Sequence, residues 1–173
     1  MKNISILLFF LLTGSVLSAQ SDRQAENDSL RKQPFRKRLT YSMGGGFFGG
    51  SVNGNTYTNL SLQPQVGYKI RTNLIAGVGL NYQYLKAGTS SYHAYGGNSF
   101  VRYLITDQFF TQLEYQLLNY SYKGPSAWND YLMIGGGYTP NRGVYISAFY
   151  LLKYPANNNF YGAPYVIRFG FMF

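Results

Sequence analysis

Apolar and polar residues alternate along most of the chain after residue 38, which is the pattern of β-strands with one apolar face. The clearest segment is 165–173, where the sequence Y-V-I-R-F-G-F-M-F makes every second side chain large and apolar. Segment 59–70 repeats the pattern, with Leu60, Leu62, Pro64, Val66, Tyr68 and Ile70 on one face and mostly polar residues on the other. The chain is therefore predicted to be built from two-faced strands.

Turns and loops divide this region at a regular pace. Tight polar turns are predicted at 71–73, 106–108 and 139–142, and longer loops rich in Gly, Asn, Ser and Pro at 49–58, 86–91, 123–127 and 154–161. The predicted strands are 39–48, 59–70, 74–85, 92–105, 109–122, 129–138, 143–153 and 162–173. Three turns and four loops connect eight antiparallel strands.

Composition indicates where such strands are stable. Aromatic residues make up 18% of the chain and charged residues 12%, whereas soluble domains average about 25% charged residues. No window after residue 20 approaches the 18 or more apolar residues of a transmembrane helix. Because backbone polar groups in lipid must be paired internally, we predict an all-β fold, a closed eight-stranded antiparallel up-and-down transmembrane β-barrel over residues 39–173.

The N-terminal part has two predicted regions. Residues 1–19 combine a lysine, an apolar run and small residues, as in a secretory signal peptide, with cleavage expected after Ala19 or after Ser18. Residues 20–38 form a polar, basic segment that is predicted to be periplasmic, either as a solvated spacer or in contact with anionic headgroups. The chain has no cysteine, so it carries neither a disulfide nor a lipoprotein anchor.

The C-terminal residues Phe169, Phe171 and Phe173 resemble the last strand of Gram-negative outer-membrane barrels, whose terminal aromatic residue is recognised by the barrel-assembly machinery. Residues 39–173 as a whole are similar to the small OmpA/OmpX-like barrels. This resemblance implies an outer-membrane location with both termini in the periplasm, short periplasmic turns and long outer loops. It implies outer-membrane lipid, lipopolysaccharide and the assembly machinery as partners, and a protein partner if the barrel is an accessory subunit.

Two aromatic girdles are also expected. The inner girdle would contain Tyr41, Tyr68, Tyr103, Phe109, Tyr138 and Phe171, and the outer one Tyr84, Tyr92, Tyr120, Tyr122, Tyr150 and Tyr154. The alternative is a soluble lipocalin-like barrel. It requires the apolar face to point inward, and it does not explain the F-x-F ending.

Three charged residues are predicted to face the lumen by the parity of their strands: Arg102, Glu114 and Arg168. Eight strands leave an interior just wide enough for side chains, and a buried carboxylate there needs a partner. We expect Glu114 to pair with Arg102 of the neighbouring strand, with Arg168 as a third member. A structural plug is favoured over a gated ion path because Phe110, Leu118 and other large side chains share the lumen.

The best candidate for catalysis surrounds the single histidine. His93 and Asp130 are expected at the outer rim, with Ser126 in a neighbouring loop, and a hydroxyl nucleophile requires a base and an orienting acid. Small barrels that acylate or deacylate lipid A carry such residues. The deacylase pattern places a serine where this chain has Tyr95, and the acyltransferase pattern has an adjacent Asp and Ser, so neither matches.

We therefore expect no catalytic residues and a structural or interaction role, with a lipid A-modifying acyl hydrolase or acyltransferase as the alternative. No metal or other cofactor is expected from one His and no Cys.

Residues 44–49 match G-x-G-x-x-G, but no helix follows, so nucleotide binding is rejected. The excess of 15 Lys and Arg over 6 Asp and Glu does not indicate nucleic acid in an exported barrel. Glycine runs at 44–46, 96–97 and 135–137 are expected where lumenal side chains need space.

Overall fold

The computed structural model describes residues 25–52, 55–87, 90–120, 126–141, 143–153 and 164–173. The predicted signal peptide 1–19 lies outside these residues, as do Tyr122 and Tyr154 of the expected outer girdle. The chain divides into two units, Met1–Arg38 and Leu39–Phe173. In the first, residues 25–31 are helical and Phe35–Arg38 forms the 3-10 helix η1, which buries none of its side chains.

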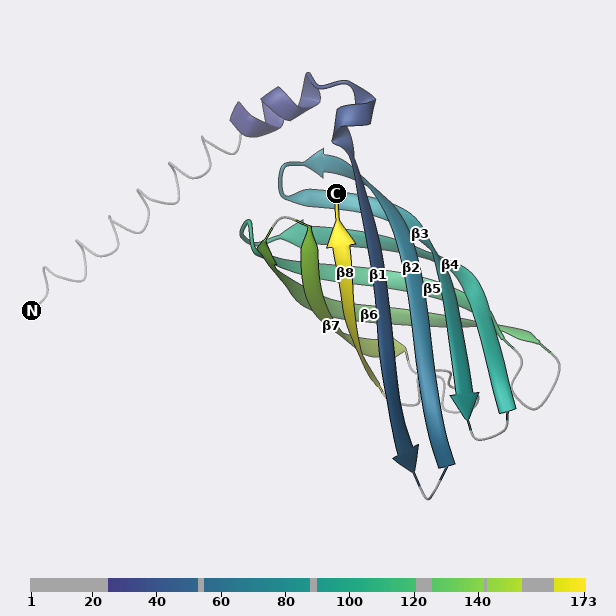
Figure 1. The fold of residues 1–173 in the computed structure, drawn as a ribbon. Coiled ribbons are helices and arrows are strands. Elements are labelled where there is room, and N and C mark those ends of the chain that lie inside the picture. Colours follow the sequence, from purple (N-terminus) through teal and green to yellow (C-terminus); the bar gives the residue numbers. More distant parts are fainter. Residues whose placement is uncertain (1–24, 53–54, 88–89, 121–125, 142, 154–163) are drawn as a thin grey trace, which may run out of the picture. The chain divides into compact units, whose positions relative to one another are not determined.

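The second unit is a closed antiparallel barrel of eight strands in chain order, as predicted (Figure 1). The strands are β1 (Leu39–Val52), β2 (Asn55–Arg71), β3 (Leu74–Ala87), β4 (Ser90–Leu104), β5 (Phe109–Tyr120), β6 (Ala127–Asn141), β7 (Val144–Lys153) and β8 (Tyr165–Met172). We call the end with connections 72–73, 105–108 and 142–143 the turn end, and the opposite end the loop end. No helix among the described residues is both long and apolar enough to cross a membrane.

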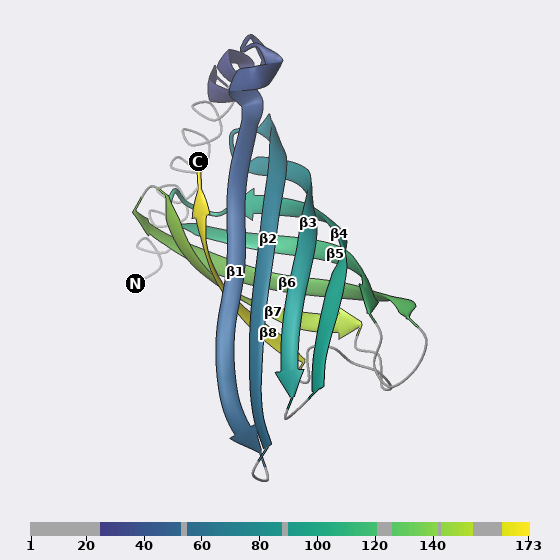
Figure 2. The same ribbon diagram turned by 45° about the vertical axis from the view of Figure 1, so that its right-hand side comes forward.

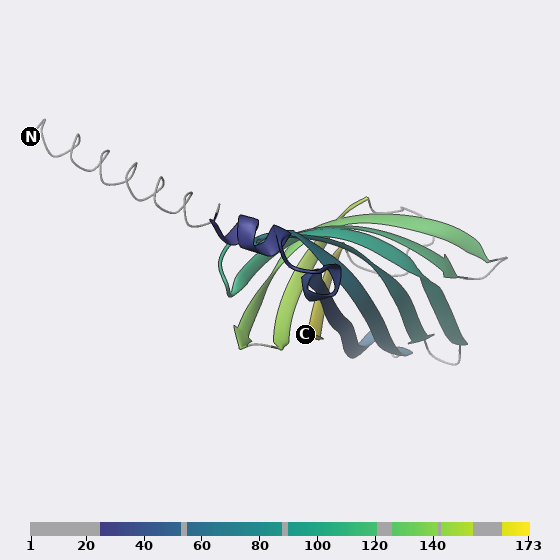
Figure 3. The ribbon, with the colours of Figure 1, turned by 90° about the horizontal axis from the view of Figure 1, so that it is seen from above.

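Closure depends on the first and last strands. Ser42 to Gly45 of β1 pair with Met172 to Phe169 of β8. At the turn end, Tyr41 and Phe173 exchange two backbone hydrogen bonds of 3.2 and 2.8 Å. Figure 3 shows the yellow strand β8 beside the dark blue β1. The last residue of the chain therefore takes part in closing the sheet.

Two of the predicted loops are wrong, because most of their residues continue strands. Pairing of β1 with β2 runs without interruption from Leu39 and Tyr68 to Val52 and Asn55, so only 53–54 connect them (Figure 2). In the same way, β3 and β4 pair as far as Ala87 and Ser90. Ladder bonds join backbone groups, so segments rich in Gly, Ser and Asn extend the hairpins without an alternating apolar pattern.

The two faces of the barrel have opposite polarity. Gln63, Gln65, Asn81, Gln83, Gln112, Glu114 and Gln116 are buried inside. Large apolar side chains are exposed on all eight strands, from Tyr41 on β1 to Phe171 on β8. This is the reverse of the lipocalin-like alternative, which is therefore contradicted. Inside, an apolar cluster also packs along β4 to β7: Ala94, Leu118, Tyr120, Tyr131, Met133, Phe149 and Leu151.

Two expected members of the outer girdle belong instead to this apolar cluster or its border. Tyr120 is 4% exposed, and its hydroxyl lies 3.0 Å from that of Tyr131. Tyr92 packs against the same cluster. Both residues share the strand parity of buried neighbours such as Ala94 and Leu118, so their rings point inward.

Pro64 lies in the middle of β2, where a missing ladder bond or a bulge is expected because proline has no N–H. The pairing of β2 with β3 is interrupted between Leu62 and Gln65 and resumes in the same register, so the ladder bond is lost without a bulge. The bulge of this pair lies further on, between Lys69 and Arg71.

Candidate functional site

Glu114 is the centre of a polar network inside the barrel. Its side chain on β5 is fully buried. The Nε2 groups of Gln63 and Gln112 donate hydrogen bonds of 2.6 and 2.9 Å to its two carboxylate oxygens. Arg168 on β8 donates from Nη1 to the same oxygens at 3.1 and 2.9 Å. The carboxylate therefore has both an ionic partner and neutral donors, which a buried charge requires.

Arg102 occupies a different position from the one expected. Its Nε donates to Gln112 Oε1 at 2.7 Å, and its Nη1 lies 3.6 Å from the sulfur of Met172. No ion pair joins Arg102 to Glu114 in the described barrel. The cross-strand partner of Arg102 is Gln112, whereas that of Glu114 is Phe100. This offset of two residues places the amide of Gln112 between the two charges.

Aromatic rings complete the surroundings of both guanidinium groups. The Arg102 group lies 4.6 Å from the centroid of Phe110 and 5.7 Å from that of Tyr145. The Arg168 group lies 4.7 Å from the centroid of Phe149. Ring faces attract cations. The three predicted lumenal charges are thus brought into one network, in which Gln112 links Arg102 to Glu114.

Each of four inward rings has a glycine as its direct cross-strand partner. The pairs are Phe100 with Gly77, Phe110 with Gly137, Phe149 with Gly135 and Tyr145 with Gly170. A Cβ added at Gly135 would come within 2.6 Å of Phe149, and one at Gly77 within 2.6 Å of Phe100. The rings therefore lie over the glycines, which explains Gly135 and Gly137 in the run 135–137.

The candidate catalytic residues point away from this network. His93 lies on the outer face of β4, with Nδ1 2.9 Å from the hydroxyl of Tyr82. Asp130, on the outer face of β6, forms an ion pair of 2.5 Å with Lys153 and accepts a hydrogen bond from Tyr115. Ser126 is exposed just before β6.

These three residues are not brought together. Asp130 pairs across the sheet with Leu117, and Leu117 pairs with Gly97, four residues after His93 on β4. A strand rises about 3.3 Å per residue, and β5 lies between the two residues. The arrangement therefore differs from a nucleophile, base and acid in hydrogen-bond reach. Among the described residues, no three His, Asp or Glu side chains are grouped as metal ligands.

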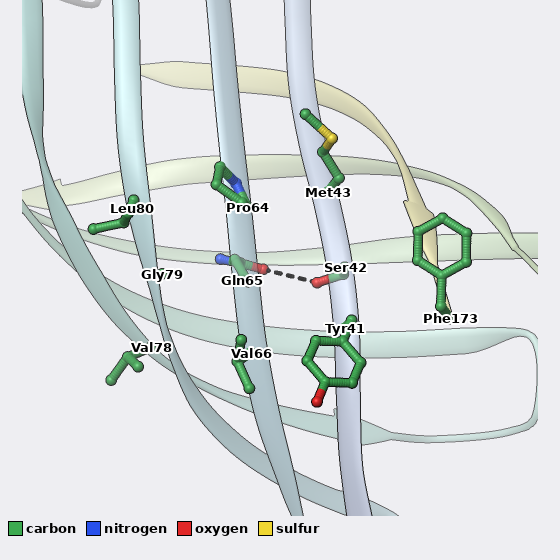
Figure 4. Close-up of a pocket in the computed structure, with 10 residues that line it drawn as sticks. All are labelled: Tyr41, Ser42, Met43, Pro64, Gln65, Val66, Val78, Gly79, Leu80 and Phe173. Carbon is green, nitrogen blue, oxygen red and sulfur yellow. Dashed lines mark hydrogen bonds between the residues drawn. The ribbon is translucent and has the colours of Figure 1, made fainter.

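An apolar groove crosses the outer face of β1, β2 and β3 (Figure 4). Its volume is about 390 Å³, and it is lined by Tyr41, Ser42, Met43, Pro64, Gln65, Val66, Val78, Gly79, Leu80 and Phe173. None of these side chains is an acid, a basic residue or a histidine. The groove offers apolar surface beside the chain terminus but no acid–base chemistry.

The predicted assembly signal lies at this side of the barrel. Phe169, Phe171 and Phe173 all point outward and are 57%, 55% and 77% exposed. Phe169 and Phe171 pair with both neighbouring strands, β1 and β7. The rings are therefore held on the sheet and are also accessible from outside the barrel.

Sequence reasoning missed the supporting residues of the network. Strand alternation puts Gln63 and Gln112 on the polar faces of β2 and β5, but their bonds to Glu114 depend on how far each strand is shifted against the next. Met133 and Met172 are expected in the lumen by strand parity, but the contacts of their sulfurs with the two guanidinium groups, at 3.6 Å, cannot be predicted from that parity. No protein-family model, curated protein or solved structure matches the chain.

Proposed function

We propose that this chain is a non-catalytic β-barrel of the Gram-negative outer membrane with a structural or interaction role. The observation that carries the proposal is the polarity of the barrel: large apolar side chains are exposed on all eight strands, and the buried lumen contains Glu114 and Arg168. An outward apolar face around a polar interior is typical of transmembrane barrels. A closed sheet also leaves no unpaired edge in lipid.

The resemblance to OmpA/OmpX-like barrels supports the same location. In that arrangement the turn end and both barrel termini face the periplasm, residues 1–19 are removed as a signal peptide, and residues 20–38 remain in the periplasm. The surrounding lipid and lipopolysaccharide contact the apolar belt. The assembly machinery engages the strand that carries Phe169, Phe171 and Phe173.

The lumen supports a structural role in preference to conduction. Glu114 has a relative exposure of 0%, and Phe100, Phe110 and Phe149 are each 3 or 4% exposed. In a barrel of eight strands, such side chains fill the interior. Protein reconstituted in planar bilayers should therefore give no stable porin-like conductance steps, and reproducible large steps would contradict this role.

Location is tested by expressing the full chain in a Gram-negative host and fractionating the cells. The proposal expects the protein in the outer membrane, as a compact form that migrates differently on a gel before and after heating. Recovery as a soluble periplasmic protein would contradict it.

The role is tested by two further measurements on the same cells. A pull-down in mild detergent identifies a protein partner if the barrel is an accessory subunit. Mass spectrometry of lipid A tests the enzymatic alternative, in which His93, Asp130 and Ser126 would be catalytic. The separation of these residues in the sheet supports the non-catalytic role, so we expect the lipid A spectrum to be unchanged by expression of the barrel.

A further inference from the structure

Three amide side chains on the inner face of the barrel have polar atoms without partners. Gln65, Asn81 and Asn98, on β2, β3 and β4, are 5%, 4% and 7% exposed. Within the described residues, no hydrogen bond is made by Gln65 Nε2, by Asn81 Nδ2 or by either polar atom of Asn98. Buried polar atoms are nearly always hydrogen-bonded in native proteins, so this cluster requires an explanation.

Two of the three amides, those of Gln65 and Asn98, converge over Gly79. This glycine is the cross-strand partner of Gln65 on one side and of Asn98 on the other. A Cβ at position 79 would lie 2.5 Å from Asn98 Oδ1 and 2.8 Å from Gln65 Cγ. Both side chains therefore lean into the space that the glycine leaves. Asn81 follows on the same face of β3, two residues further along.

The unpartnered atoms are three amide nitrogens, which donate, and one amide oxygen, which accepts. A ligand must therefore accept several hydrogen bonds and also donate one, and it must fit among side chains inside a narrow barrel. Water meets these requirements, and buried waters typically make about three hydrogen bonds to such groups. Elsewhere in the lumen, the side chain of Leu118 belongs to the apolar cluster and offers water no polar atom.

We propose that the lumen contains a buried water site bound by Gln65, Asn81 and Asn98 over Gly79. The site lies next to the charge network, because Asn98 is two residues from Phe100, the cross-strand partner of Glu114. One half of the lumen is then filled by side chains alone, and the other half by side chains together with bound water. This inference does not depend on the membrane location or on the role of the barrel.

The first test is nuclear magnetic resonance of the isotopically labelled full barrel in deuterated detergent micelles. The side-chain amide protons of Asn81 and Asn98 should show cross-peaks at the water frequency, whereas the methyl groups of Leu118, on the apolar side, should show none. Absence of water cross-peaks at the two amides would overturn the proposal. Equal cross-peaks at the amides and at Leu118 would overturn it too, since the lumen would then be wet throughout.

The second test compares Asn98→Leu with Asn98→Ser by urea unfolding. If water is bound at the site, leucine at position 98 displaces it and leaves the amides of Gln65 and Asn81 without partners. Serine at the same position keeps a hydroxyl and leaves room for the water. The Asn98→Leu variant should then have the lower urea midpoint. In a dry lumen, leucine would fill the space and remove an unpartnered amide, whereas serine would leave a cavity. A midpoint for Asn98→Leu at or above that of Asn98→Ser would overturn the proposal.

Discussion

Arg168 meets Glu114 across the lumen, with its Nη1 2.9 Å from one carboxylate oxygen and 3.1 Å from the other. The two residues lie on β8 and β5, which are not neighbours in the barrel. Their contact therefore ties together parts of the sheet that no ladder of backbone hydrogen bonds joins. Both side chains are buried, at 5% and 0% exposure, so each charge depends on the other.

Replacing Glu114 by Gln should destabilise the barrel strongly. The substitution keeps the size of the side chain and removes the charge that balances Arg168, and breaking a buried ion pair in this way costs about 3–5 kcal/mol. The free energy of unfolding in urea, measured in detergent or lipid, reports the loss. A decrease below about 1 kcal/mol would show that the pair does not stabilise the fold.

A double-mutant cycle separates the two arginines. Glu114→Gln combined with Arg168→Met should show a coupling energy toward the upper end of the roughly 0.5–3 kcal/mol range for residues in contact. The same cycle with Arg102→Met is the control, and it should show a smaller coupling because Gln112 lies between Arg102 and Glu114. The opposite order would contradict the pairing.

The membership of this network follows from the sequence, but its pairing does not. Strand parity indicates which side chains enter the lumen, and it places Glu114, Arg102 and Arg168 there correctly. Parity carries no information on the shift between neighbouring strands or on which strands face each other after closure. Those two quantities give Glu114 the partner Arg168 instead of Arg102. The same parity would also have placed Tyr92 inside, as the structure does.

Glycines under the inward rings should not tolerate a larger residue. At Gly77 an added methyl group would meet the ring of Phe100 and the backbone oxygen of Val66, so Gly77→Ala should lower the free energy of unfolding by about 1–3 kcal/mol, as overpacking does. The control is Gly97→Ala, because its methyl group would meet only the backbone oxygen of Gly79, at an ordinary 3.4 Å. Equal losses for the two variants would contradict the ring-over-glycine packing.

The glycines also mark where sequence reasoning about strand lengths fails. The loop predicted at 49–58 rests on residue types that are common in turns, yet the structure continues the β1–β2 ladder to Val52 and Asn55. Residues typical of turns adopt a strand conformation here because the partner strand satisfies their backbone hydrogen bonds. Glycine in a strand costs conformational entropy, and the neighbouring ladder compensates for that cost.

Loss of the terminal ring should impair assembly. Replacing Phe173 by Asp leaves the backbone hydrogen bonds with Tyr41 available but puts a charge on the outer face at closure, where the proposed surroundings are lipid. A smaller amount of the compact, heat-modifiable protein should therefore reach the outer membrane. Phe173→Trp keeps an aromatic ring and is the matched control. Equal amounts of compact protein for the Asp and Trp variants would contradict a role of the ring in assembly.

His93 is expected to be dispensable for both folding and chemistry. Its ring lies on the outer face of β4, with a hydrogen bond to Tyr82 and a tilted ring contact with Tyr84, at a centroid distance of 5.1 Å. Substitutions at such exposed positions usually change stability by no more than about 0.5 kcal/mol, so His93→Ala should unfold at nearly the wild-type urea concentration.

The same variant tests the catalytic alternative independently of folding. Because Asp130 is paired with Lys153 and is separated from His93 by β5, no relay from acid to base exists for the substitution to break. Lipid A from cells that express His93→Ala should match lipid A from cells that express the wild-type barrel. Lipid A from cells that express Asp130→Asn should match it as well. A normally folded His93 variant that alters the lipid A spectrum would refute the non-catalytic role and would direct attention to Ser126 as a nucleophile.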